Sequence, residues 1–80
     1  MATNPIIETR FVIARNIKYR RMALGMTQSA LGDRVFLGPK AISDREVGKR
    51  SIDAEDLPRF AAALEVQVSE LFETGRFYRD

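Results

Sequence analysis

The sequence predicts an all-α fold in which five helices pack into one compact domain. Three observations lead to this prediction. A chain of 80 residues is long enough for one domain only. Its apolar residues recur at helical spacing, and its glycines and prolines fall at intervals that mark helix ends. We therefore expect a single domain over residues 1–80, with its core at about residues 5–74 and a tail at 75–80.

The composition argues against several classes of protein. Apolar residues make up 45% and charged residues 30% of the chain, as in a folded soluble domain. We expect no membrane-spanning helix, because no run of about eighteen apolar residues occurs. The N-terminus lacks the basic start and apolar stretch of a signal peptide. Because cysteine and histidine are both absent, the usual metal ligands and the usual general base are missing. We expect no enzyme activity, metal or cofactor.

The charge is distributed unevenly. Residues 1–53 contain ten Lys and Arg against five Asp and Glu, a net +5, whereas residues 54–80 contain three against six, a net −3. A basic face on a small domain favours a polyanionic partner, although ordinary surface charge would give a similar pattern.

The first helix is expected from Asn4 as its cap and Pro5 at its first position to a point near Leu24. Gly25 is placed to close it in a left-handed conformation. Its inward side is expected to hold Ile6, Phe11, Ile13, Ile17 and Leu24. Its outer face is expected to hold Arg10, Arg15, Lys18, Arg20 and Arg21.

A short second helix is expected after Thr27, whose hydroxyl can cap the first turn. Leu31 and Val35, four residues apart, would face inward together. Gly32 lies mid-helix, where glycine costs about 1 kcal/mol relative to alanine. We expect a steric reason for that glycine, such as another helix that crosses closely.

A third helix is expected to begin at Pro39, after the short break at residues 36–38, and to end at Gly48. Only Ile42 and Ala41 suit its inward side, so most of this helix should be exposed. Two short helices joined by a three-residue turn, with the second one polar, are typical of a helix-turn-helix that places a helix in the DNA major groove. The segment at residues 27–46 is therefore the predicted DNA-binding element.

The remaining elements are a fourth helix and a fifth helical turn. Asp53 or Asp56 can cap the fourth helix. Pro58 would bend a helix that began at Ala54, and a start nearer Leu57 removes that conflict. The inward residues of this helix are expected to be Leu57, Phe60, Ala61 and Leu64. The fifth turn is expected around Ser69, Leu71 and Phe72, closed by Gly75.

The ordered set of segments over about residues 13–72 resembles the Cro and phage-repressor class of helix-turn-helix regulators, the XRE family. The matching segments are residues 13–21, 24–28, 41–43, Glu46, 48–50 and 61–72 (AAALEVQVSELF). The resemblance implies a compact five-helix, lambda-repressor-like domain that binds double-stranded operator DNA, usually as a homodimer on a two-fold symmetric site.

The resemblance also implies roles for individual residues. The glutamine at the start of the second helix, here Gln28, contacts a DNA phosphate in the family. Outward positions of the third helix face base edges, and basic residues after it approach phosphate. Arg21 and Glu46 match a buried ion pair that joins the first helix to the third. The expected DNA-contacting residues are Thr27, Gln28, Ser29, Gly38, Pro39, Lys40, Ser43, Asp44, Lys49 and Arg50.

The chain departs from the family pattern at four positions. Phe36 stands where the family often has a left-handed glycine, so the turn is expected to differ, with Gly38 taking part. Pro39 replaces a glutamine and cannot hydrogen-bond a base. Arg20 and Arg45 occupy positions that are usually apolar. Either their stems cover the core while their heads reach water, or the second and third helices sit differently from the family norm.

Three functional classes follow. The first is a small transcription regulator of the repressor class that occupies a promoter in the cytoplasm, encoded by a bacterium or a phage. The second is an antitoxin-type module of the same fold, and the third is a protein-interaction module that has lost DNA binding. We expect homodimers through the fifth helix and the tail, since Phe72, Phe77 and Tyr78 exceed what a small core needs. No membrane partner is expected.

Overall fold

A computed structural model describes the backbone of residues 5–77 and the side chains of residues 8–77. Ile6, expected on the inward side of the first helix, and Tyr78, expected at the dimer surface, therefore fall outside the described side chains. The helices are α1 (Pro5–Ala23), α2 (Gln28–Val35), α3 (Pro39–Glu46) and α4 (Leu57–Ala63). Two 3-10 turns, η1 (Ala54–Asp56) and η2 (Val68–Phe72), complete the described chain.

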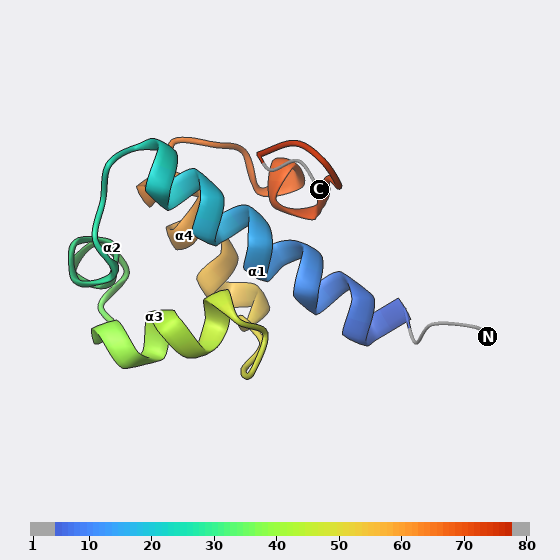
Figure 1. The fold of residues 1–80 in the computed structure, drawn as a ribbon, viewed down its shortest axis with the longest axis horizontal. Helices are drawn as coiled ribbons and strands as arrows, with labels where there is room; N and C mark the ends of the chain where they lie inside the picture. The colour runs from blue at the N-terminus through green and yellow to red at the C-terminus, as the bar shows by residue number, and fades with distance from the viewer. Residues whose placement is uncertain (1–4, 78–80) are drawn as a thin grey trace.

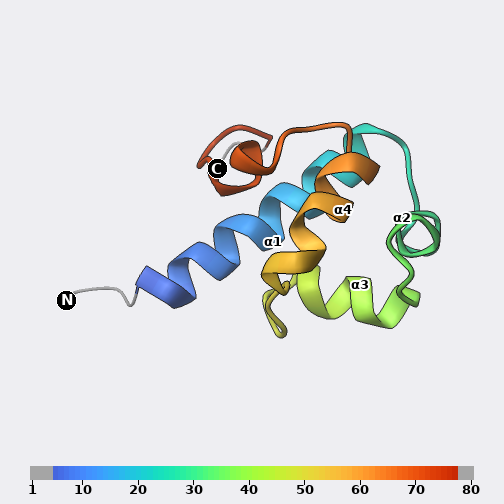
Figure 2. The same ribbon diagram turned by 180° about the vertical axis from the view of Figure 1, so that it is seen from behind.

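The helices surround one core (Figures 1 and 2). Helix α1 runs diagonally across the molecule in Figure 1, and α4 lies behind it; in Figure 2 α4 is in front. Helices α2 and α3 lie at the opposite side from the C-terminal segment, and the first half of α1 extends beyond the other helices. The buried core residues are Ile17, Leu31, Val35, Ile42, Phe60, Ala61, Ala63, Leu64 and Leu71. The all-α fold is confirmed.

The predicted cap of the first helix, Asn4, lies outside the described residues, and the other predicted helix ends agree closely with the structure. The Thr27 hydroxyl oxygen accepts a 3.0 Å hydrogen bond from the Ala30 N–H, which satisfies one of the free amides at the start of α2. Helix α4 begins at Leu57, which places Pro58 within its first turn, where proline is tolerated. The fifth helix, in contrast, is a 3-10 turn and not an α-helix.

Glu70 organises this 3-10 turn. Its carboxylate accepts a 3.0 Å hydrogen bond from the Gln67 N–H and pairs with Arg76 at 2.7 Å. The hydrogen bond from Gln67 is the main cause that lowers the pKa of Glu70, and Arg76 adds to it. Because a lowered pKa in the folded state means that the ionised form is favoured by folding, this contribution to stability is present above the ordinary pKa of a glutamate. It is lost as the pH falls through the lowered pKa.

The expected outer face of α1 is only partly exposed. Arg20 is half-buried, and its Nε donates a 2.8 Å hydrogen bond to the Leu64 carbonyl at the end of α4. The head of Arg20 therefore binds the C-terminus of α4, whereas one of the two expectations was that this head would reach water. Phe11, expected inward, is 42% exposed, and its ring lies against the backbone of Gly48. Phe11 therefore supports the loop after α3 and not the core.

Gly32 has a steric role that differs in detail from the prediction. A Cβ at this position would collide with the carbonyl oxygen of Leu37 in the turn that follows α2. Leu37 also donates its N–H to the Gly32 carbonyl at 2.9 Å, so the turn folds back on the helix. The close neighbour is thus the turn backbone, with the Ile42 side chain of α3 beyond it.

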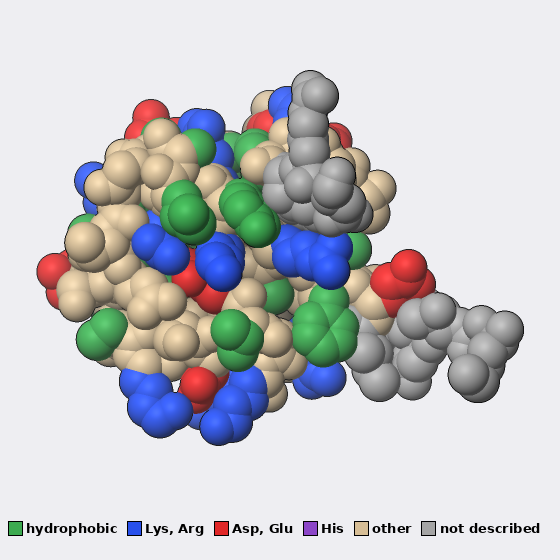
Figure 3. Space-filling view, in the orientation of Figure 1, with side chains coloured by type: hydrophobic (Ala, Val, Ile, Leu, Met, Phe, Trp, Pro, Cys, Tyr) green, Lys and Arg blue, Asp and Glu red, His purple; other side chains and the backbone are tan. Residues whose placement is uncertain are grey.

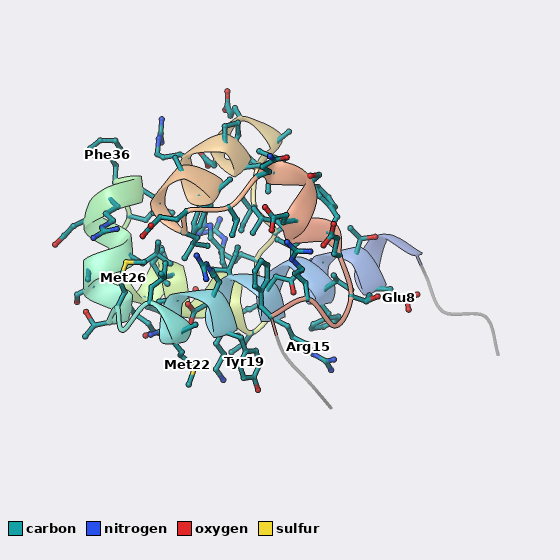
Figure 4. All side chains as sticks on the ribbon, turned by 90° about the horizontal axis from the view of Figure 1, so that it is seen from above. Glu8, Arg15, Tyr19, Met22, Met26 and Phe36 are labelled. Atoms are coloured by element: carbon teal, nitrogen blue, oxygen red, sulfur yellow. The ribbon has the colours of Figure 1, made fainter. Side chains whose placement is uncertain are left out.

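The turn between α2 and α3 contains a residue in an unfavourable conformation. Phe36 has φ 61° and ψ 40°, the left-handed region, and its N–H donates to the Gly32 carbonyl. Gly38 has an extended backbone and caps α3, so the expectation that Gly38 changes the turn is wrong. The Phe36 ring is 80% exposed and projects from the end of α2 (Figure 4), with the Arg59 guanidinium 5.2 Å from its centroid.

Replacing Phe36 with glycine is expected to raise the free energy of unfolding by about 0.5–1 kcal/mol. The substitution removes a left-handed strain of about 1–2 kcal/mol and loses a cation–π contact of about 0.5–1 kcal/mol. Phe36→Ala is the matched control, because it loses the ring and keeps the strain. Urea denaturation should rank the glycine variant above both the native chain and the alanine variant; the reverse order would show that the ring contributes more than the strain costs.

Candidate nucleic-acid interface

Helix α3 has one buried and one exposed side. Ile42 is completely buried in the core. Gly38, Pro39 and Lys40 are exposed at the start of the helix, and Ser43 and Asp44 are half-exposed one turn later. The structure therefore brings the five predicted α3 positions together on one outward surface. Because the side opposite Ile42 has little to pack against, this helix is free to enter a groove in a partner.

A buried ion pair fixes α3 to α1. The Arg21 Nε lies 2.6 Å from Glu46 Oε2, and a second guanidinium nitrogen donates to Oε1 at 3.1 Å. The side chain of Glu46 is 1% exposed and that of Arg21 is 11% exposed. A third guanidinium nitrogen donates to the Met26 carbonyl at 2.7 Å, just before α2. The two-pronged geometry fixes the orientation of α3 as well as its position.

Gln28 belongs to the same cluster. Its side-chain amide donates a 3.1 Å hydrogen bond to Glu46 Oε1, so one carboxylate joins α1, α2 and α3. The sequence assigned this amide to a DNA phosphate, and in the structure it already has a partner. The N–H groups of Gln28 and Ser29 have no acceptor within the helix, because they lie in its first turn. Thr27 and Ser29 are exposed beside them, so the start of α2 still offers donors to an anion.

Lys40 and Asp44 form an ion pair on the outward surface of α3. The Lys40 Nζ lies 3.3 Å from Asp44 Oδ1, and the lysine side chain is 81% exposed. Such an exposed pair at i and i+4 contributes only about 0.3–0.5 kcal/mol. Either side chain can therefore leave the other for a base edge at little cost.

The basic residues after α3 are held close to its end. The N–H groups of Lys49 and Arg50 both donate to the Asp44 carbonyl, at 2.9 and 3.2 Å. Gly48 adopts φ +78° between them and the helix, a conformation that suits glycine. Both basic side chains are exposed. Lys and Arg side chains gather over α1 and α3 on the face shown in Figure 3.

Val47 is a surface residue that the sequence reasoning missed. It is 59% exposed and follows Ser43 by four and Asp44 by three residues, the spacing that places side chains on one helical face. That spacing can be read from the sequence, but an apolar residue next to Gly48, the expected helix end, gives no local sign that it is exposed. Val47 extends the α3 surface towards Lys49 with a group able to contact a thymine methyl.

Neither a metal site nor a membrane-crossing helix occurs in the described part of the chain. Within residues 8–77, no three Asp or Glu side chains are grouped closely enough to hold a metal ion. No described helix has the length and apolarity that crossing a membrane requires.

Comparison with known proteins gives a consistent result. The family model described as helix-turn-helix (HTH_3) matches residues 17–71. The c2 repressor of phage P22, solved in complex with synthetic operator 9T, is 30% identical over 76% of this chain and 92% of that chain, with a TM-score of 0.71. The hypothetical transcription factor NHTF from Neisseria is 26% identical over 95% of this chain and 88% of that chain, with a TM-score of 0.79.

A third structure supports the fold alone. The clp gene regulator ClgR from C. glutamicum is 22% identical over 85% of this chain and 86% of that chain, with a TM-score of 0.74. No curated protein matches the chain.

Proposed function

Because this chain belongs to the XRE-type helix-turn-helix family, we propose that it is a transcription regulator that binds double-stranded DNA with α3 in the major groove. The observation that carries the proposal is the arrangement of α3. One side is fixed in the core by Ile42 and by the Arg21–Glu46 pair, and the other presents Pro39, Lys40 and Asp44 outward. A rigid helix with an exposed polar face is what reading of base edges requires.

The outward residues divide into base-reading and phosphate-binding groups. Lys40 can donate to the acceptors of guanine, and Asp44 can accept from the cytosine amine. Pro39 can contact a thymine methyl, and Ser43 is assigned a position near the DNA backbone. Phosphate contacts are assigned to the start of α2, to the N-cap of α3 and to the loop after α3. The phosphate-binding group consists of Thr27, Gln28, Ser29, Gly38, Lys49 and Arg50.

The same proposal includes a homodimer on a palindromic operator, acting as a repressor. Two copies of α3 would then meet half-sites about 34 Å apart. The c2 repressor of phage P22, at 30% identity, was solved with a synthetic operator. Phe72 in η2 is 45% exposed and is a candidate for the dimer surface, whereas Phe77 is half-buried with the Arg20 guanidinium 5.9 Å from its ring. If the chain sediments as a monomer at tens of micromolar protein, both with and without operator DNA, the proposed dimer is contradicted.

Replacing Asp44 with asparagine is expected to raise affinity for random duplex DNA about three- to tenfold. The substitution removes a negative charge from the surface that meets phosphate and releases Lys40 from its ion pair. The same variant should lose preference at one base pair, because the carboxylate no longer accepts from cytosine. Competition titrations on random and selected duplexes measure both effects. Glu55→Gln, an exposed carboxylate before α4, is the matched control and should change neither.

Selection from a random duplex library tests the proposed function. The purified full chain should enrich a recurring, two-fold symmetric sequence, and the enriched duplex should bind at least tenfold more tightly than random DNA. Binding without such a preference would contradict a sequence-specific regulator. No binding to any duplex would point instead to an antitoxin-type or protein-interaction module of the same fold.

A further inference from the structure

A cavity lies between α1 and the loop that follows α3. The loop at residues 47–53 passes beside the middle of α1 in both Figure 1 and Figure 2. The cavity has a volume of about 190 Å³ and is open on one side. Its polar wall contains the arginines Arg10 from α1, Arg45 from α3 and Arg50 from the loop. Three separate segments of the chain thus converge on one space.

The charges around this cavity are all positive. No Asp or Glu lines it. The Nε atoms of Arg10 and Arg45 are buried and have no hydrogen-bond partner among the described residues. One other nitrogen of Arg45 donates to the Ala41 carbonyl at 2.9 Å, which satisfies that nitrogen but does not balance its charge. An unsatisfied buried donor costs about 1–3 kcal/mol, and more on a charged group.

Three other arginines of the described chain are neutralised by carboxylates. Arg21 pairs with Glu46, Arg59 with Asp56, and Arg76 with Glu70. Placing three guanidinium groups around one cavity without a carboxylate is costly, because each like charge disfavours the others. An anion that entered the cavity would relieve this repulsion and would accept hydrogen bonds from the guanidinium groups that line it.

The cavity also has an apolar wall. This wall consists of Ile13 and Ala14 from α1 and Ile52 from the loop. Inorganic phosphate would leave this wall in contact with water, whereas an anion with a compact apolar body would cover it. The volume suits such a molecule, since an apolar cavity of about 150 Å³ can hold benzene.

We propose that this cavity binds a small organic anion, a phosphate monoester or carboxylate attached to a compact apolar group. The oxyanion lies between Arg10, Arg45 and Arg50, and the apolar body lies on Ile13 and Ile52. The site is distinct from the DNA-contacting surface except at Arg50, which belongs to both. If the proposed DNA binding holds, the bound anion lowers DNA affinity, because Arg50 cannot serve two phosphates at once and the added negative charge repels the duplex.

Calorimetric titration of the full chain with phenyl phosphate tests the site without DNA. We expect saturable binding at one site per chain in the native protein and in Arg59→Gln, a variant of an arginine that does not line the cavity. Arg10→Gln and Arg45→Gln should each weaken binding at least tenfold. Circular dichroism establishes that each variant is folded. If Arg45→Gln unfolds, Arg10→Lys replaces it and should also bind more weakly, since lysine retains charge but loses the forked donors.

Three outcomes would overturn the proposal. One is an effect of phenyl phosphate no larger than that of sodium chloride at equal ionic strength. Another is equal binding by the native chain, Arg10→Gln and Arg59→Gln. The third is that Arg10→Gln weakens binding to duplex DNA while no variant binds phenyl phosphate, which would assign these arginines to a DNA backbone phosphate. If the chain does not bind DNA, the proposed function fails, but the titration with phenyl phosphate still decides whether this anion site exists.

Discussion

Replacing Glu46 with glutamine is expected to lower the free energy of unfolding by about 3–5 kcal/mol. The side chain is almost completely buried and accepts hydrogen bonds from Arg21 and Gln28. The substitution leaves the guanidinium of Arg21 buried without its opposite charge, and that loss has a cost of this size in other buried pairs. A domain of this size has a total stability of about 4–12 kcal/mol. Urea denaturation should therefore show a much lower midpoint, or an unfolded chain.

A double substitution separates the cost of an unpaired charge from the value of the pair. Arg21→Met with Glu46→Met replaces both partners with apolar groups of similar length. It should recover part of the lost stability, because no charge is then left buried. DNA affinity is a second readout, because it depends on the orientation of α3. The double variant, although folded, should bind DNA more weakly, since α3 loses its two-pronged attachment to α1. A single Glu46→Gln variant that loses less than about 1 kcal/mol would contradict this account of the pair.

Replacing Asn16 with aspartate is expected to lower the free energy of unfolding by about 3 kcal/mol or more near neutral pH. Asn16 is fully buried, and its amide nitrogen donates to the carbonyls of Leu71 at 2.7 Å and Glu73 at 2.9 Å. Aspartate has the same shape but places a charged acceptor against those acceptors, which leaves them unsatisfied and buries a charge. The C-terminal segment should separate from α1 before the rest of the domain unfolds.

The pH dependence of this variant provides its control. Burial and the facing carbonyls raise the pKa of the introduced carboxyl above its value in the unfolded chain. The penalty is therefore smallest below the unfolded pKa, where the group is protonated in both states and can donate. It grows as the pH rises through the folded pKa. Urea midpoints at acidic and neutral pH measure this, and a penalty that does not change with pH would contradict the role of the Asn16 amide.

Helix boundaries were predictable because they depend on local chemistry. Thr27 caps α2, Pro39 opens α3, and Gly25 has the left-handed φ of 71° expected at the end of α1. Each of these residues acts within one turn of its own position. The order of helices and the exposed side of α3 follow from the same local signals, with the family resemblance giving the arrangement of the helices in space.

Contacts between distant segments were harder to predict. Asn16 looked like one polar residue among many, and only the folded chain places the Leu71 carbonyl beside it. Arg20 was assigned to the outer face by its charge, whereas the end of α4 provides it with a carbonyl. The amide of Gln28 was assigned to DNA, but Glu46 lies within reach in the folded chain. Helical periodicity predicts which face of a helix a residue occupies. It does not predict which residue of another segment that side chain contacts.

The turn at Phe36 shows a different reason for a wrong expectation. Left-handed geometry is costly for phenylalanine, so the sequence suggested that the turn would change. The structure keeps the turn, with φ 61° at Phe36. The Leu37 carbonyl must approach Gly32 closely, and both hydrogen bonds to the Gly32 carbonyl require this path. Tertiary packing therefore overrides the local preference of one residue.

The central claim is that α3 and the loop after it bind DNA. The most direct test is titration of the library-selected duplex at two salt concentrations. The native chain is compared with Lys49→Ala combined with Arg50→Ala, and with the matched pair Arg59→Ala and Arg76→Ala on other surfaces. We predict that the first pair reduces the slope of log affinity against log salt by about 0.9 for each lost phosphate contact. The matched pair should leave the slope unchanged. Equal slopes for all three proteins, or equal losses in both double variants, would contradict the claim.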